Sequence, residues 1–332
     1  MVSSVTMSDI AKEMGVSTVT VSKALSDKDG VSDSLREKIK EKAVEMGYRY
    51  NSMAKSIKDG ISGNVGVLVS ERYFSDNAFY SNLYKRNVLD LNALGYSCIL
   101  EIVSRSDQEN GILPTMVTNN KVDGIIILGH LRSQYIYKLS ELGIPYIFQD
   151  FYDERYDVDS VVSDNVYGCY VLTNYLFKKG LTKLAFLGDI HATSSIMDRY
   201  LGYYKSLLEH DVEIRKDWII SDRDEAANYD SVNLPAEMPQ AFVCNCDESA
   251  YKLVIQLKEQ GYRIPEDISV VGFDDFIYAT FSNPQLTTYR VGLETMSETV
   301  VDAIVKKIKD PSYRIGRKVI GGNIVIRKSV KE

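Results

Sequence analysis

The chain of 332 residues is long enough for two or three compact domains, and its 45% hydrophobic and 26% charged residues are ordinary for a globular protein. No apolar run approaches the roughly 20 residues that a membrane span needs, and the N-terminus lacks a secretory signal, so we expect a cytoplasmic protein. The net charge of −7 is uneven, because residues 1–60 carry +1 and the rest −8. Bulk charge therefore gives no argument for nucleic-acid binding.

The first fifty residues predict three short helices. The first is expected to be capped by Thr6 and the second by Ser17, and the third is expected to begin near Ser32. Gly15 separates the first helix from the second, which spans 18–25, and Gly47 ends the third. Each helix has one apolar face, so the three can close a small core.

Two short helices joined by a glycine turn are typical of a helix-turn-helix, whose second helix enters the major groove of DNA. Small hydroxyls suit phosphate oxygens, methyl groups can meet a thymine methyl, and a lysine can reach guanine or phosphate. The candidate DNA-contacting residues in this segment are Thr6, Ser17, Thr18, Val19, Thr20, Ser22, Lys23 and Ser32.

Beyond residue 60, short apolar runs alternate with amphipathic helical stretches. The alternation runs from VGVLVS at 65–70 to DGIIILG at 123–129, with one helix expected near 107–120, and begins again after 160–165. Such alternation predicts parallel β-sheet. Because each half holds several βα units, we expect two doubly wound lobes, with a ligand cleft where the carboxyl ends of their strands meet.

Motifs for catalysis or cofactor binding are not found in the sequence. His130, His191 and His210 share no motif with a serine, a cysteine or a metal-ligand spacing, and no GxGxxG or Walker-type loop follows a strand. Cys244 and Cys246 lie in an apolar run and are expected as buried reduced thiols. We therefore expect a protein that is not an enzyme and needs no metal or cofactor.

The strings TMSDIAKEMGVSTVTVSKALSD and VSDSLREKIKEKAVEMGYRYN resemble the DNA-binding headpiece of the LacI/GalR (lac repressor) family of bacterial transcriptional regulators. The remainder resembles that family's effector domain, which is similar to periplasmic sugar-binding proteins. The segments that carry this likeness are, in order, DGIIILG, IPYIFQD, VVSDNVYG, DRYLGYYKSL, AFVCNCDESA, SVVGFDD, NPQLTTYR and IVIRKSV. The resemblance covers essentially the whole chain.

The resemblance implies a small all-α helix-turn-helix headpiece followed by an α/β periplasmic-binding-protein-like effector domain of two doubly wound lobes. The expected boundaries are 1–50 for the headpiece, 51–60 for a hinge helix or linker, and 61–332 for the effector-binding and dimerisation domain. Within that domain the N-lobe is expected at about 63–162 and 292–320, and the C-lobe at about 163–290 and 321–332.

The family's hinge helix inserts an apolar side chain into the minor groove, and residues 51–60 occupy that place. Ile57 stands at the wedge position, with Lys55 beside it and Asn51 at the start, and these three are further candidate DNA contacts. Ile57 could instead pack the linker onto the effector domain. The chain departs from the family pattern, because Tyr50 replaces the usual proline, Lys55 an arginine and Ile57 a leucine.

For the ligand cleft, the resemblance points to Arg199 and Asp274, with Asp150 and Asn245 as weaker candidates. Carboxylates accept hydrogen bonds from paired hydroxyls and a guanidinium or amide fixes orientation, so the set suits a sugar. Each residue could instead form an interlobe or helix-end ion pair. Aromatic side chains after the first strand could stack on a sugar face or belong to the core; the candidates are Phe79 and Tyr73.

Together these features predict a sequence-specific transcriptional regulator, expected to be a repressor, whose operator affinity is controlled by a small ligand, expected to be a carbohydrate. A homodimer on a near-palindromic double-stranded operator is expected, because two-fold protein symmetry matches two half-sites. Two alternatives stay open: a sugar-binding protein without DNA regulation, and a regulator that responds to a purine-type co-repressor.

Overall fold

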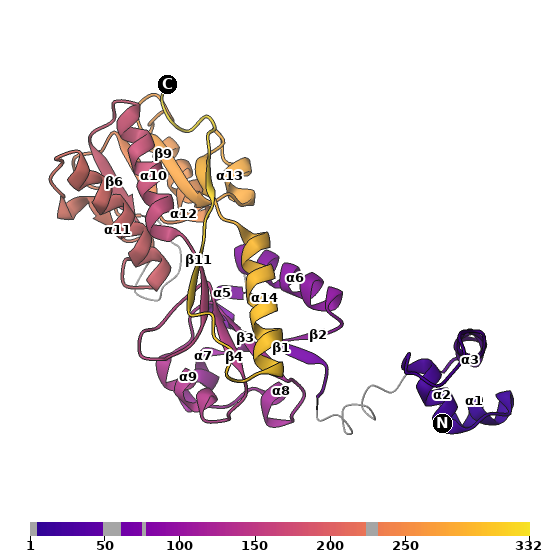
Figure 1. Ribbon diagram of the computed structural model, residues 1–332. Helices are drawn as coiled ribbons and strands as arrows, with labels where there is room; N and C mark the ends of the chain where they lie inside the picture. The colour runs from indigo at the N-terminus through magenta and orange to yellow at the C-terminus, as the bar shows by residue number, and fades with distance from the viewer. Residues whose placement is uncertain (1–4, 49–60, 75–77, 224–231) are drawn as a thin grey trace. The chain divides into compact units, whose positions relative to one another are not determined.

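The computed structural model describes residues 5–48, 61–74, 78–223 and 232–332, and the chain divides into two units, Met1–Ser62 and Gly63–Glu332 (Figure 1). The first unit is all-α and the second is α/β with two sheets, which confirms the predicted fold class. The predicted hinge and its candidate contacts Asn51, Lys55 and Ile57 lie outside the described residues.

The small unit contains three helices, α1 (Met7–Met14), α2 (Thr18–Leu25) and α3 (Asp33–Glu45). Gly15 ends α1 with a φ of 64°, a left-handed conformation that favours glycine, and this lets the chain turn into α2. The helices meet over a core of aliphatic side chains: Ile10, Ala11, Val21, Ala24, Ile39 and Ala43.

The N-lobe of the larger unit is built on a six-stranded parallel sheet in the order β11-β5-β4-β3-β1-β2. Its strands are β1 (Asn64–Ser70), β2 (Ser97–Val103), β3 (Gly124–Leu128), β4 (Tyr146–Gln149), β5 (Ser160–Ser163) and β11 (Arg317–Ile320). Its helices are α5 (Glu71–Phe74), α6 (Ala78–Ala93), α7 (Arg105–Asn110), α8 (Thr115–Thr118), α9 (Ser133–Ser140) and α14 (Leu293–Lys309). The central strand β3 is buried along its whole length, as expected for a parallel sheet covered on both faces.

The segment near 107–120 differs from its prediction as a single helix. The chain forms α7 and α8 instead, because Gly111 ends α7 in a left-handed conformation with a φ of 63° and Pro114 precedes α8. Both residues are helix-ending signals in the sequence.

The C-lobe holds the second six-stranded sheet, in the order β12-β10-β9-β8-β6-β7. Its strands are β6 (Leu184–Leu187), β7 (Ile219–Ile220), β8 (Ala241–Cys244), β9 (Ser269–Asp274), β10 (Thr287–Arg290) and β12 (Asn323–Val325). Its helices are α10 (Asn165–Lys178), α11 (Ser194–Glu209), the 3-10 turn η1 (Lys216–Trp218), α12 (Asp247–Glu259) and α13 (Ile277–Phe281). Only β12 runs antiparallel to its neighbour in the described sheet.

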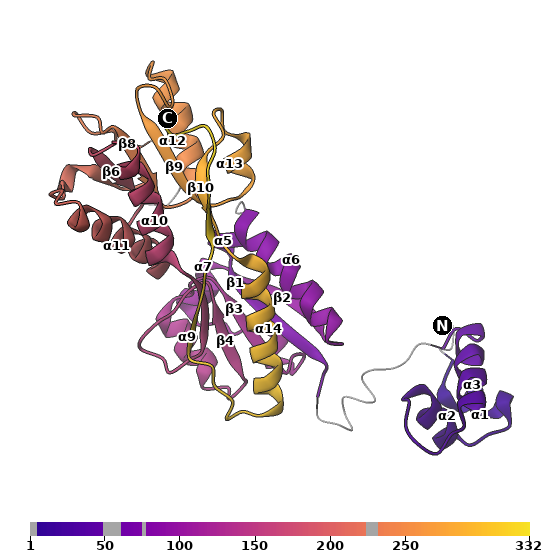
Figure 2. The same ribbon diagram turned by 45° about the horizontal axis from the view of Figure 1, so that its top comes forward.

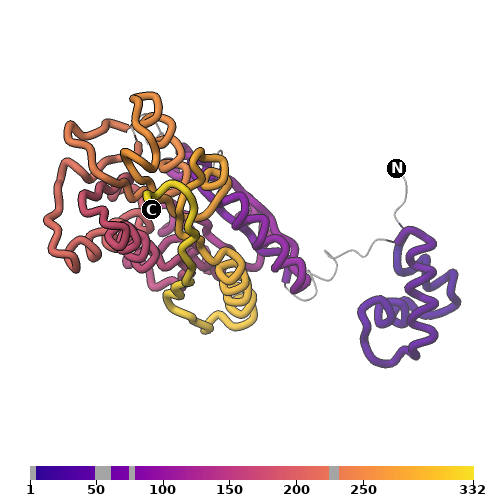
Figure 3. Tube along the Cα trace, turned by 90° about the horizontal axis from the view of Figure 1, so that it is seen from above, coloured from indigo at the N-terminus to yellow at the C-terminus, as the bar shows by residue number. Residues whose placement is uncertain are grey.

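Three chain crossings join the lobes, at 163–165, 290–293 and 320–323 (Figure 2). After the second crossing α14 returns to the N-lobe and packs beside α6 (Figure 3). A buried polar contact supports this packing, because the Ser297 hydroxyl donates a hydrogen bond to Asp90 Oδ2 at 2.6 Å. The crossings bring the carboxyl ends of strands from both sheets toward one region.

Candidate functional site

The N-terminal end of α2 turns small polar and apolar side chains outward. Ser17 caps the helix, since its Oγ accepts a hydrogen bond from the backbone N–H of Thr20 at 3.1 Å. Val19 is 65% exposed, whereas Val21 and Ala24 are fully buried in the core of the unit. An exposed methyl group beside hydroxyls at a helix N-terminus is what a DNA-reading helix presents to a major groove.

The other candidate DNA contacts of this unit lie on the same short helices or at their starts. Half or fully exposed side chains are found at Thr18, Ser22, Lys23 and Ser32. Thr6 caps α1 in a capping box, since its N–H donates to Asp9 Oδ2 at 2.8 Å and its Oγ1 accepts from the Asp9 N–H at 3.3 Å. The Thr6 side chain therefore has a structural task within the described residues, whatever it does on DNA.

Between the two lobes, the structure gathers four of the candidate ligand residues into one group, here called the interlobe cluster: Asp150, Arg199, Asn245 and Asp274. Arg199 lies at its centre on α11 and is 5% exposed. Its Nη2 is 3.2 Å from Asp274 Oδ1, and its Nη1 donates a hydrogen bond to the carbonyl oxygen of Asn245 at 2.6 Å. Its Nε donates to Asn165 Oδ1 at 2.8 Å, so the neighbouring polar groups hold the guanidinium in place.

Asp150 follows β4 and has a left-handed φ of 64°, a conformation that costs a non-glycine residue about 1 kcal/mol or more. Its Oδ2 accepts a hydrogen bond from the Tyr80 hydroxyl at 2.9 Å, while its Oδ1 is buried without a hydrogen-bond partner among the described residues. Burial raises the pKa of Asp150 to about 6, although Arg199 and the Tyr80 hydrogen bond oppose the shift.

Asp274 ends β9 with a φ of 105°, so the backbone of a second carboxylate in the cluster is strained. Burial raises its pKa to about 7; the Arg199 charge opposes the shift and the Asp150 charge adds to it. Its Oδ1 meets Arg199 at ion-pair distance but without hydrogen-bond geometry. For Arg199, burial lowers the pKa, but the charges of Asp274 and Asp150 outweigh it and leave the guanidinium charged.

The amide of Asn245 is committed to the scaffold. Its Nδ2 donates hydrogen bonds to Asp222 Oδ2 at 2.6 Å and to the Leu187 carbonyl at 3.2 Å. Asp222, which the sequence did not single out, also accepts from the Ser249 hydroxyl at 2.6 Å and from the Asp189 N–H at 2.9 Å. Asp222 therefore orients Asn245, whose backbone carbonyl in turn holds Arg199.

The two aromatic candidates have different surroundings. Phe79 is 6% exposed and packs edge-on against Phe276 of the C-lobe, with ring centroids 5.4 Å apart. Tyr73 is half-buried, lies 5.6 Å from the Tyr80 ring, and has the Arg72 guanidinium 5.6 Å from its own centroid. Phe79 therefore joins the lobes as a core residue, and Tyr73 keeps part of its surface available.

Several polar residues at the ends of strands, and one on α6, were not predicted as site residues. Ser163 ends β5, and its Oγ is buried without a partner among the described residues; Asp222 and Arg223 follow β7. Examining each polar residue at the carboxyl end of a predicted strand could have found Ser163, but not Asp222 or Arg223, because β7 was not predicted. Tyr80 lies within α6 and has no such signal, because its contact with Asp150 depends on how α6 packs on the sheet.

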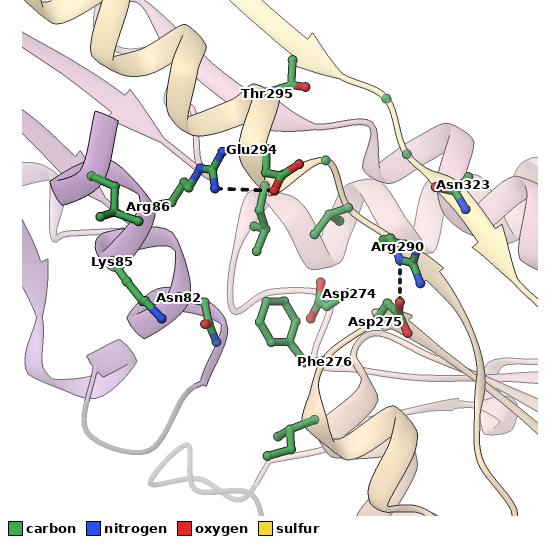
Figure 4. Close-up of a pocket in the computed structure, with 17 residues that line it drawn as sticks. Asn82, Lys85, Arg86, Asp274, Asp275, Phe276, Arg290, Glu294, Thr295 and Asn323 are labelled. Atoms are coloured by element: carbon green, nitrogen blue, oxygen red, sulfur yellow. Dashed lines mark hydrogen bonds and ion pairs between the residues drawn. The ribbon is translucent and has the colours of Figure 1, made fainter. Parts of the chain in front are cut away.

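A pocket of about 690 Å³ opens between the lobes beside the second and third crossings (Figure 4). Asn82, Lys85 and Arg86 line it from α6, and Arg86 makes an ion pair with Glu294 of α14 at 3.5 Å. Asp274 is the member of the interlobe cluster that lines this pocket; Arg199, Asp150 and Asn245 are not among its lining residues. We take the cluster as the candidate ligand site, because Asp150 Oδ1 is buried there without a hydrogen-bond partner among the described residues, and treat the pocket as an adjoining surface.

Other classes of site find no support within the described ranges. No group of three or more His, Cys, Asp and Glu side chains there is arranged to hold a metal ion. No described helix combines the length and the apolar character of a membrane span. The four cysteines are unpaired thiols, and Cys244 and Cys246 are buried.

Comparison with known proteins bears on both units. Residues 6–51 match the model of bacterial regulatory proteins of the lacI family, and residues 173–330 match the periplasmic binding protein-like domain. The chain has the domain composition of a lacI-family regulator. The predicted family resemblance is therefore confirmed, and so is the predicted class of function, a DNA-binding regulator with a ligand-binding domain.

Curated relatives match over nearly the whole length of this chain. The HTH-type transcriptional repressor PurR of Vibrio campbellii is 25% identical and aligns over 98% of this chain and 99% of its own. The HTH-type transcriptional regulator RegA of Clostridium saccharobutylicum is 28% identical over 94% and 96% of the two chains. These matched relatives are named as transcriptional regulators, not as enzymes.

Solved structures share the fold. The lac repressor dimer bound to operator and the anti-inducer ONPF has a TM-score of 0.79 at 24% identity, covering 99% of this chain and 100% of the other. The complex of the transcriptional regulator CelR with cellobiose has a TM-score of 0.72 at 24% identity, covering 98% and 99%. At these identities the likeness establishes a common architecture.

Proposed function

We propose that this chain is a repressor that binds a near-palindromic operator as a homodimer and loses or gains operator affinity when a sugar binds between its lobes. The observation that carries the proposal is the interlobe cluster. Asp150 Oδ1 is buried without a partner among the described residues, and Asp274 Oδ1 meets only an ion pair. A buried polar group left unpaired costs about 1–3 kcal/mol, so a ligand that supplies hydrogen bonds there recovers that free energy.

The chemistry of these acceptors favours a ligand rich in hydroxyl donors. The two carboxyl groups can each accept from a sugar hydroxyl, and the Arg199 guanidinium, 3.2 Å from Asp274, keeps that carboxylate in place. The structurally similar CelR complex contains cellobiose, which supports the same ligand class. A purine-type co-repressor is the second candidate, favoured by the half-buried Tyr73 ring, on which a flat base could stack.

A homodimer is supported by apolar side chains exposed on both lobes. Phe281 is 67% exposed and Ile277 46% exposed on α13, and Leu89 is 52% exposed on α6. Leu89 and Ile277 both line the pocket of Figure 4, so one continuous surface of the two lobes offers apolar area to a second copy. The structurally similar lac repressor is a dimer on its operator.

The proposal makes the chain a cytoplasmic regulator without catalytic activity, because its proposed task is to bind operator DNA and a small ligand, not to transform a substrate. A sugar-binding protein without DNA regulation is the main alternative. The exposed N-terminal end of α2 argues against it, since a pure solute-binding protein has no use for Val19 at 65% exposure beside Ser17 and Thr18.

The test is fluorescence anisotropy with DNA fragments selected by the full chain, at stated salt, with and without a panel of mono- and disaccharides and purine bases. We expect tight binding to a near-palindrome, altered by one sugar. Val19→Glu should abolish operator binding through repulsion of the phosphate backbone and leave sugar binding intact. Sugar binding without specific DNA binding would support the solute-binding alternative, and a response to purines alone would reassign the ligand.

A further inference from the structure

A hydrogen bond between the two lobes lies beside the interlobe cluster. The Tyr152 hydroxyl, on the N-lobe segment after β4, donates to Asp198 Oδ1 on α11 of the C-lobe at 2.9 Å. The Arg317 guanidinium on β11 lies 4.6 Å from the centroid of the Tyr152 ring. We call these three residues the interlobe latch. They connect the two lobes, which three chain crossings also join covalently.

The latch is attached to the same two segments that carry the ligand residues. Tyr152 lies two residues after Asp150, and Asp198 directly precedes Arg199. Successive residues of a helix project about 100° apart, so Asp198 faces the N-lobe segment at Tyr152 while Arg199 turns toward Asp274. A change in the latch therefore moves Arg199 relative to Asp150 without touching a ligand.

The latch has the strength to bias lobe closure. Its acceptor is a carboxylate, and hydrogen bonds to charged acceptors are roughly twice as strong as neutral ones. Both side chains are half-buried, so water competes for them only in part. Arg317 places a positive charge near the Asp198 carboxylate and a flat guanidinium on the Tyr152 ring, so it supports both partners.

We propose that the latch of Tyr152, Asp198 and Arg317 favours a closed arrangement of the lobes and thereby positions Arg199 and Asp150 for the effector. Tyr152 and Asp198 are positioning residues that do not contact the ligand. A second consequence is that the latch raises effector affinity, because a ligand that binds the closed state binds more tightly when that state is already populated. This second consequence rests on the proposed function.

The first experiment measures lobe closure in the full chain without any ligand. Spin labels on the exposed positions 137 of α9 and 208 of α11, in a Cys98→Ser background and diluted with unlabelled chain, report the distance between the lobes by pulsed electron paramagnetic resonance. Tyr152→Phe and Asp198→Asn should shift the distribution to a more open arrangement. Tyr156→Phe is the matched control, because the Tyr156 hydroxyl donates to the Ser133 carbonyl within the N-lobe.

The second measurement is the affinity for a sugar that alters operator binding by the wild type. Tyr152→Phe should weaken that affinity about tenfold, as expected for loss of one hydrogen bond to a charged group, whereas Tyr156→Phe should not change it. Distance distributions of both latch variants that coincide with those of the wild type and the control would overturn the proposal. If no sugar acts on the wild type, the proposed function fails, and the ligand-free distances still decide the latch.

Discussion

The larger unit contains two buried groups of charged residues that differ in their hydrogen bonding: the Lys307–Asp159 pair and the interlobe cluster. In the N-lobe, the Lys307 ammonium donates to Asp159 Oδ2 at 2.5 Å, and Asp159 Oδ1 accepts from the N–H groups of Ile315 and Gly316 at 3.0 and 2.7 Å. Both oxygens of that carboxylate are satisfied. In the interlobe cluster, Asp150 Oδ1 has no partner among the described residues.

The difference indicates what each cluster is for. Asp159 ties α14 to the chain leading into β11, so its hydrogen bonds are complete in the protein itself. Asp150 and Asp274 have left-handed backbones and raised pKa values, and such strained, incompletely paired groups gather at functional sites. Substitutions at the Lys307–Asp159 pair should therefore lower the stability of the protein, whereas substitutions in the interlobe cluster should weaken ligand binding.

The largest effect is expected for Lys307→Met. The change leaves the Asp159 carboxylate buried without its cation, which typically costs about 3–5 kcal/mol in the free energy of unfolding. Denaturant unfolding followed by circular dichroism measures it. Lys306→Met is the control, because the Lys306–Asp302 pair is exposed to solvent and should leave stability unchanged. Equal losses in the two variants would contradict the contrast.

Asp150→Asn should have the opposite effect to Lys307→Met, because it should reduce ligand binding and not stability. We expect effector affinity to fall about a hundredfold, since the amide removes a charged acceptor facing the ligand, while stability stays equal or rises because a buried charge is gone. Isothermal titration with the sugar found active on operator binding measures the first quantity and denaturant unfolding the second. A strongly destabilised variant with normal affinity would place Asp150 in the scaffold.

The pH dependence of stability should show whether the Asp274 carboxyl group is buried in the cluster, because a solvated carboxylate would have an ordinary pKa. Asp274 has a folded pKa of about 7, above its unfolded value near 4, so the folded state binds more protons between these values. Its contribution to the free energy of unfolding is therefore greatest at low pH and falls as pH rises from about 4 to 7, by roughly 3 kcal/mol. Asp274→Asn should remove this part of the slope in unfolding curves from pH 5 to 8. Parallel curves for the two proteins would show that the carboxyl is not perturbed.

The smallest expected effect concerns the headpiece, where one hydroxyl stabilises a helix and a neighbouring one is available for DNA. The Ser17 hydroxyl is used by the Thr20 N–H, whereas the exposed Thr18 hydroxyl has no partner among the described residues. Ser17→Ala should lower the stability of the headpiece by about 1 kcal/mol through the lost cap. Thr18→Ala should leave thermal unfolding unchanged and weaken operator binding in anisotropy titrations. Similar thermal shifts for both would assign Thr18 a structural role.

The sequence was sufficient where the signals are local. The caps at Thr6 and Ser17, the turn at Gly15 and the alternation of strands and helices depend on neighbouring residues, and the described structure has each of them. The division of 107–120 into two helices was not predicted, because the helical periodicity was followed through Gly111. The left-handed backbone of Gly111 ends α7 in spite of that periodicity. The hinge prediction stays a prediction.

What the sequence by itself determined is the two-unit organisation and the set of polar residues at strand ends from which a site could be built. Only the tertiary structure decided how those residues are used. Tyr80 meets Asp150 across 70 positions and Tyr152 meets Asp198 across 46, so strand order and lobe packing set both contacts. Asn245, a weaker candidate for ligand contact in the sequence, lies in the cluster, but its amide donates a hydrogen bond to Asp222. Hydrogen bonds between distant segments depend on how sheets and helices pack. This packing involves the whole fold, so the residues next to each partner in the sequence do not reveal the contact.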